Sequence, residues 1–128
     1  MIVYHGSKIK VSNPDIYHSR KKVDFGTGFY STPLYEQAKS LCQRYLRTTG
    51  KAFISKYILD DKAFKVCKVL KFESHSEEWL DFILSCRREK DNTDYDIVMG
   101  GVANDNVFDT VELYFENLID KKEAIKRL

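Results

Sequence analysis

Between residues 33 and 48 the apolar residues recur at steps of three and four, which places them along one face of a helix. The residues that open this stretch suit a helix start. Thr32 can accept a hydrogen bond from a free first-turn amide, and Pro33 loses nothing there by lacking an N–H. Gly50 marks the region where this helix is expected to end. We therefore predict a helix over 33–48, with an apolar stripe of Leu34, Ala38, Leu41, Cys42, Tyr45 and Leu46.

On both sides of this helix, strand-like and helix-like segments follow one another without regular alternation. The short polar link 60–62 predicts that the runs beside it, both rich in Phe, Ile, Val and Tyr, pair as a hairpin. Ser74 followed by Glu77 is a capping-box pattern. This order favours an α+β fold over a doubly wound sheet. The predicted strands are 2–5, 28–31, 51–59, 63–72 and 95–99, and the other predicted helices are 74–90, 106–118 and 121–128.

The composition is that of an ordered globular protein. The 128 residues suit a single domain over 1–128. A balance of 21 basic against 19 acidic residues leaves +2, which by itself indicates neither nucleic acid nor membrane as a partner. The three cysteines are an odd number without metal-ligand spacing, so we expect reduced thiols, a cytoplasmic location and no metal site. The sequence has no apolar run long enough to predict a membrane span.

Two glycine-containing motifs are candidates for a binding site. YHGS, residues 4–7, ends the first predicted strand, and DFGTGFYST, residues 24–32, leads into the helix. Glycine lets a backbone approach a ligand closely, although glycines in a strand usually mark a bulge. Histidine at a strand end is more often structural, and Phe29 and Tyr30 in a strand are normally core. Since alternate strand residues face opposite sides, one of these rings can be core while the other lines a cleft.

Together, in this order and spacing, the motifs resemble the ADP-ribosyltransferase superfamily. The likeness is to the branch whose signature is His, Tyr and Glu, which includes the poly-ADP-ribose polymerases and diphtheria toxin. The whole chain is also similar to an uncharacterised bacterial family of small domain-of-unknown-function proteins, through YHGS, DFGTGFY, the EEW helix start and YDIVMGGVAND. The resemblance implies a split mixed or antiparallel sheet with flanking helices, within the α+β class.

The resemblance implies NAD as the ligand of the first motif. His5 would offer a ring nitrogen to a ribose hydroxyl. Gly6 would exchange backbone hydrogen bonds with the nicotinamide amide, and Ser7 would give its hydroxyl to the same amide.

For the second motif the resemblance implies a floor beneath the nicotinamide. Tyr30 would stack its ring on the nicotinamide, a contact worth about 1 kcal/mol. Gly26 and Gly28 would keep that floor free of side chains, and Phe25 is expected in the core.

The third catalytic residue of this superfamily is a Glu that stabilises a cationic ribose. None of the late acidic residues here stands in the matching context. Asp105 is the in-chain candidate beside His5 and Tyr30, and a helix N-cap is its alternative interpretation. The bacterial relatives that the chain resembles continue past KEAIKRL into a strand that opens with an Asn-Gln pair. We therefore expect the C-terminal strand to be missing, because the chain is naturally short, truncated or completed by another chain.

The function that the resemblance implies is NAD-dependent mono-ADP-ribosyl transfer to a macromolecule, protein or nucleic acid. Small bacterial members of such families often act as toxins held by a partner, which implies an antitoxin-like protein or a phage-defence setting. The alternative is a catalytically silent module that binds NAD or a partner. The run 20–22 could contact a diphosphate or an anionic acceptor, or be a solvated loop, and the near-neutral total charge disfavours a nucleic-acid-binding domain.

Overall fold

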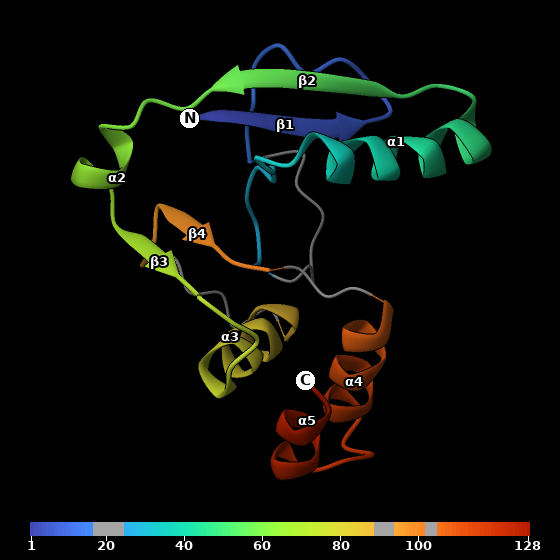
Figure 1. The fold of residues 1–128 in the computed structure, drawn as a ribbon, viewed down its shortest axis with the longest axis vertical. Helices are drawn as coiled ribbons and strands as arrows, with labels where there is room; N and C mark the ends of the chain where they lie inside the picture. Colours follow the sequence, from blue (N-terminus) through green and yellow to red (C-terminus); the bar gives the residue numbers. More distant parts are fainter. Residues whose placement is uncertain (17–24, 89–93, 102–104) are drawn as a thin grey trace. The chain divides into compact units, whose positions relative to one another are not determined.

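The computed structural model describes residues 1–16, 25–88, 94–101 and 105–128, and the chain forms two compact units (Figure 1). The first unit comprises Met1–Ser19 and Gly28–Val66, and the second comprises Arg20–Thr27 and Cys67–Leu128. The elements are β1 (Ile2–Ser7), α1 (Tyr35–Thr49), β2 (Phe53–Ile58), α2 (Ala63–Val66), β3 (Val69–Lys71), α3 (Glu77–Arg87), β4 (Ile97–Met99), α4 (Asp105–Phe115) and α5 (Lys121–Arg127).

This mixture of helices with small sheets confirms the α+β class. The single domain inferred from the chain length stays a prediction. Within the described ranges, no helix has both the length and the apolar character needed to cross a membrane. The predicted run 20–22 lies outside the described residues.

The first unit is a two-stranded antiparallel sheet with one helix against it. β1 and β2 pair over their full length, from Ile2 opposite Ile58 to Ser7 opposite Phe53. α1 lies beside β1 (Figure 1) and buries Ala38 and Cys42 from its apolar stripe. Few side chains of this unit are buried, because a two-stranded sheet offers one helix only a narrow surface to cover.

The bounds of α1 differ slightly from the prediction. The helix begins at Tyr35 rather than at 33, and Thr32 acts just outside it: its hydroxyl accepts from the Leu34 amide at 3.1 Å and donates to Gln37 Oε1 at 2.6 Å. The predicted end of the helix near Gly50 is confirmed. Gly50 adopts a left-handed conformation with φ 75°, and its N–H donates to the Leu46 carbonyl at 3.0 Å.

The strand predicted over 28–31 is wrong. Only Thr32 pairs with β1, exchanging backbone hydrogen bonds of 2.7 and 2.9 Å with Tyr4. The next amide that could face β1 is that of Leu34, which donates to Thr32 Oγ1 at 3.1 Å instead, so the pairing ends after one residue.

The hairpin predicted around the link 60–62 is also wrong. β2 pairs with β1, and the run 63–72 divides into α2 and β3. Asp60 explains the division, because its side chain accepts from the Lys62 amide at 2.9 Å and its carbonyl accepts from the Ala63 amide at 2.9 Å. These local bonds begin a helical turn where the sequence pattern predicts a strand.

The second unit combines a short parallel sheet with three helices. β3 pairs with β4 from Val69 opposite Ile97 to Lys71 opposite Met99. Asp96 anchors this pairing, since its carboxylate accepts from the Lys68 amide at 2.8 Å. The core is contributed by α3, α4 and α5, with Phe25 and Phe72 packed against it, and its buried members are Trp79, Leu80, Ile83, Val111 and Ala124.

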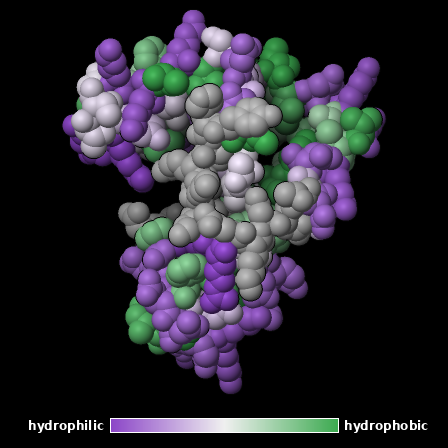
Figure 2. All heavy atoms as spheres, turned by 180° about the vertical axis from the view of Figure 1, so that it is seen from behind, coloured by the Kyte–Doolittle hydropathy of each residue, from purple (hydrophilic) through white to green (hydrophobic). Residues whose placement is uncertain are grey.

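The start of α3 lies two residues later than the capping-box pattern indicates. Ser76, not Ser74, is the N-cap, and its hydroxyl accepts from the Trp79 amide at 3.3 Å. Polar side chains cover most of the helical end of this unit (Figure 2), as expected for amphipathic helices around one core.

Candidate functional site

The predicted site residues divide between the two units. Gly26 and Asp105 belong to the second unit. Gly26 is buried with φ 79°, a conformation that favours glycine, and Asp105 is the first residue of α4. The first unit holds His5, Gly6, Ser7, Gly28 and Tyr30.

His5 and Tyr30 are joined directly, although 25 residues separate them in the chain. The half-buried His5 ring forms a hydrogen bond through Nδ1 with the backbone carbonyl of Tyr30. Since a carbonyl oxygen only accepts, Nδ1 carries the proton of this bond. In the neutral ring, Nε2 is then left as an acceptor, which is the group that a ligand hydroxyl requires.

The aromatic ring beside His5 is Phe29. The two ring centroids lie 4.4 Å apart with planes inclined by 30°, and Phe29 in turn meets Tyr57 edge-on at 5.6 Å. The Tyr57 hydroxyl donates to the carbonyl of Val11. Sequence reasoning missed this packing on His5. Residues 28–31 form no strand, so no local pattern places the Phe29 ring on His5.

Gly6 has no side chain because α1 occupies the space. A Cβ atom at this position would lie 2.9 Å from the carbonyl oxygen of Ala38 and 3.1 Å from Cys42 Sγ. The first distance is to backbone, which cannot move away without shifting the helix. The glycine is therefore explained by helix–strand packing, whatever its backbone contacts.

Gly6 is buried, and its backbone lies on a strand edge whose pairing the described residues do not continue past Tyr4. Met1 and Leu59 exchange backbone bonds of 3.0 and 2.8 Å on the β2 side, and Tyr4 bonds Thr32 on the other side. Backbone groups of a strand alternate between its two edges, so the N–H and C=O of Gly6 point the same way as those of Tyr4. Past the Tyr4 bridge, no described residue forms a hydrogen bond with Gly6 there.

The remaining residues of the first unit add one acceptor and one ring. The Ser7 hydroxyl donates to the Ile9 carbonyl, so its lone pairs are what it can offer an amide. A Cβ atom at Gly28 would lie 4.0 Å from Cε1 of Tyr30, which places this ring next to the glycine. Tyr30 and Gly28 are both half-buried.

The described groups are a ring nitrogen of His5, the N–H and C=O of the buried Gly6, and the aromatic ring of Tyr30. Among described residues, no acidic side chain contacts His5, Gly6 or Ser7. Among the described residues, His5, Gly6 and Ser7 thus offer groups for binding, and no acidic side chain is hydrogen-bonded to them.

A separate hollow of about 450 Å³ lies along α5 in the second unit, lined by Asp120, Lys122, Glu123, Ile125 and Lys126. It includes none of the predicted site residues. Its walls are mostly solvent-exposed charged side chains of one short helix, so it offers little enclosure for a ligand.

Comparison with known proteins gives one finding. A family model described as "Protein of unknown function (DUF3990)" matches residues 1–128. Searches of curated proteins and of solved structures found no match.

Proposed function

The chain belongs to the DUF3990 family, and from this premise we propose that it binds NAD through the first unit and transfers ADP-ribose to a macromolecule. The family description assigns no function, so the proposal depends on the site and on the resemblance of its two motifs. The observation that carries it is the hydrogen bond from His5 to the Tyr30 carbonyl, because it brings the two motifs together with Nε2 left as an acceptor.

Each residue has a defined part in this proposal. His5 orients the ribose by accepting a hydroxyl proton at Nε2. Gly6 accepts from and donates to the carboxamide along the strand edge past the Tyr4 bridge, and Ser7 adds an acceptor. Tyr30 packs against the flat ring. These contacts fix the donor so that one face of its glycosidic carbon meets the acceptor.

The chemistry is a transfer at the ribose carbon that carries nicotinamide. The carbon–nitrogen bond to nicotinamide breaks and its electron pair leaves with nicotinamide, which becomes neutral. A nucleophilic oxygen or nitrogen of the acceptor bonds the same carbon, and the acceptor proton passes to water. NAD supplies both the leaving group and the ADP-ribosyl group, so it is a substrate rather than a resident cofactor.

A second candidate function is supported by the lack of an acidic contact among the described site residues. A module that binds NAD without breaking it needs His5, Gly6 and Tyr30 but no Glu. In a toxin–antitoxin type of system, such a module would act through its partner.

The test measures NAD binding and nicotinamide release separately, with the full chain and a cell lysate as the source of acceptor. His5→Ala and Tyr30→Ala are expected to weaken NAD binding at least tenfold, whereas Tyr30→Phe keeps the ring and the affinity. His75→Ala in the second unit is the matched control. Binding with release supports the transferase, binding without release supports the silent module, and no saturable binding by folded wild type refutes both.

A further inference from the structure

We propose that the first unit binds single-stranded nucleic acid through a basic face. This face consists of Lys8, Lys39, Arg44, Arg47 and Lys51, all of which are exposed. Lys8 comes directly after β1 and three residues after His5. Lys39, Arg44 and Arg47 lie on α1, and Lys51 comes shortly after that helix. That the bound nucleic acid is also the ADP-ribose acceptor rests on the proposed function, but binding does not.

The first observation is that the near-neutral total charge conceals two opposite units. By sequence, the first unit has nine basic and four acidic residues, a net charge of +5, whereas the second has twelve basic and fifteen acidic residues, a net charge of −3. The total charge therefore does not argue against nucleic acid as a ligand of the first unit. A domain-level excess of this kind is the electrostatic footprint expected of a polyanion-binding surface.

The second observation concerns how these charges are compensated. Throughout the described part of the first unit, none of the nine basic side chains forms an ion pair. In the described part of the second unit, four of eight do: Lys71, Arg87, Lys121 and Arg127. The cations of the first unit are thus not needed to hold carboxylates, and they remain able to neutralise phosphates.

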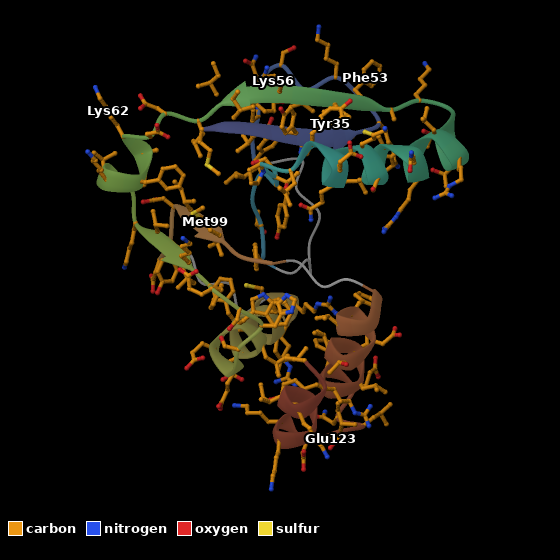
Figure 3. The ribbon with its side chains drawn as sticks, in the orientation of Figure 1. Tyr35, Phe53, Lys56, Lys62, Met99 and Glu123 are labelled. Carbon is orange, nitrogen blue, oxygen red and sulfur yellow. The ribbon has the colours of Figure 1, made fainter. Side chains whose placement is uncertain are left out.

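The third observation is that aromatic rings accompany these cations. Lys8 Nζ lies 5.8 Å from the ring centroid of Tyr45 on α1. Tyr35 at the start of α1 is 47% exposed and lies four residues, about one helical turn, before Lys39 (Figure 3). Exposed rings beside cations are the combination that binds unpaired bases, because every base offers a flat face for stacking.

These features favour single-stranded nucleic acid over other polyanions. An acidic protein or an anionic membrane would use the charge but not flat stacking surfaces, and a duplex hides its base faces. The 15 residues of α1 extend about 22 Å, enough for its three cations to follow several successive phosphates of one strand.

The experiment measures fluorescence anisotropy of a labelled 20-nucleotide single strand, as DNA and as RNA, with the full chain at 50, 100 and 200 mM salt. The triple variant Lys39→Ala, Arg44→Ala, Arg47→Ala is expected to bind at least tenfold more weakly at 50 mM salt. Its log–log salt slope should fall by about 2 if three phosphate contacts are lost. Since all three side chains are exposed, the variant should keep the wild-type circular dichroism and melting curve.

The matched control removes three cations from the second unit, as Lys68→Ala, Lys122→Ala, Lys126→Ala, and should bind within twofold of wild type. A finer pair is Tyr35→Leu, expected to weaken single-strand binding about threefold, against Phe108→Leu, a ring of similar exposure in the second unit, expected to change nothing.

Three outcomes would overturn the proposal: no saturable wild-type binding at 50 mM salt, equal loss in the two triple variants, or preferential binding of polyglutamate or of vesicles with 30% anionic lipid. NAD titration of the same preparations separates the two proposals. Oligonucleotide binding without NAD binding would leave the basic face intact and refute the transferase.

Discussion

The two units of this protein treat apolar and charged side chains in opposite ways. The second buries a continuous core and pairs half of its described cations. The first buries little: of the twelve large apolar residues that are exposed in the described ranges, ten belong to it, and apolar side chains reach its surface in Figure 2. None of its described Lys and Arg side chains forms an ion pair.

This difference separates a scaffold from a recognition surface. Burial of apolar area supplies most of the free energy of folding, so the second unit is expected to be the more stable of the two. The first unit carries the His5–Tyr30 contact and the basic face. Exposed rings and unpaired cations contribute little to stability, whereas both are common where macromolecules or ligands bind.

The largest expected contrast comes from one substitution made in each unit. Ile83→Ala empties a fully buried position of the second core and should lower the free energy of unfolding by about 2–4 kcal/mol. Ile58→Ala removes a side chain that is 82% exposed in the first unit and should cost less than about 1 kcal/mol. Chemical denaturation measures both changes. Equal losses would contradict the division into scaffold and surface.

A second pair of substitutions tests packing in the first unit alone. Gly6→Ala places a methyl group 2.9 Å from the Ala38 carbonyl and should cost about 1–3 kcal/mol. Gly28→Ala meets nothing closer than 4.0 Å and should be nearly neutral. Hydrogen exchange of the β1 and β2 amides reports the loss locally. If Gly6→Ala reduced NAD binding without any loss of protection, the glycine would serve the ligand rather than the helix contact.

A smaller effect locates the start of α3. Ser76→Ala removes the cap to the Trp79 amide and should cost about 1 kcal/mol, whereas Ser74→Ala should leave the melting temperature unchanged. Thermal melts of the two variants decide between the observed cap and the one that the capping-box pattern indicates.

The smallest effect is electrostatic and lies on the surface of the second unit. The hydrogen bond to Asp81, with help from Glu77, raises the pKa of Lys121 above its ordinary value of 10.5. Stability from this raised pKa is present below the unfolded pKa and is lost as the pH rises through the folded one. In NMR titrations Asp81→Asn should lower the pKa of the Lys121 amine relative to wild type.

Local sequence signals predicted the helices better than the strands. Gly50, the apolar stripe of α1 and the two C-terminal helices follow from periodicity and capping, which act within a few residues. Strand pairing depends on residues far apart: β1 pairs with a strand about 50 positions later, which no local pattern encodes. The strand predicted over 63–72 is wrong for the opposite reason, because Asp60 begins a helical turn through hydrogen bonds to its nearest neighbours.

In the candidate site the two motifs are joined through His5 and Tyr30, by contacts that the sequence did not predict. His5 meets the backbone of Tyr30, while the ring against it belongs to Phe29. Gly6 faces α1 with the side that would carry a Cβ atom, a contact visible only once the helix is placed. Phe25 was predicted as core, and it packs against the core cluster of the second unit.

The path of the chain through its two units has a consequence for dissecting the protein. The segment Arg20–Thr27 lies within the second unit, although the chain before and after it belongs to the first. A single cleavage between Val66 and Cys67 would therefore leave an N-terminal fragment that still contains Phe25, although this side chain packs against the core of the second unit. Neither half can be expressed intact by shortening the gene from one end, so binding has to be mapped by point substitutions in the full-length chain.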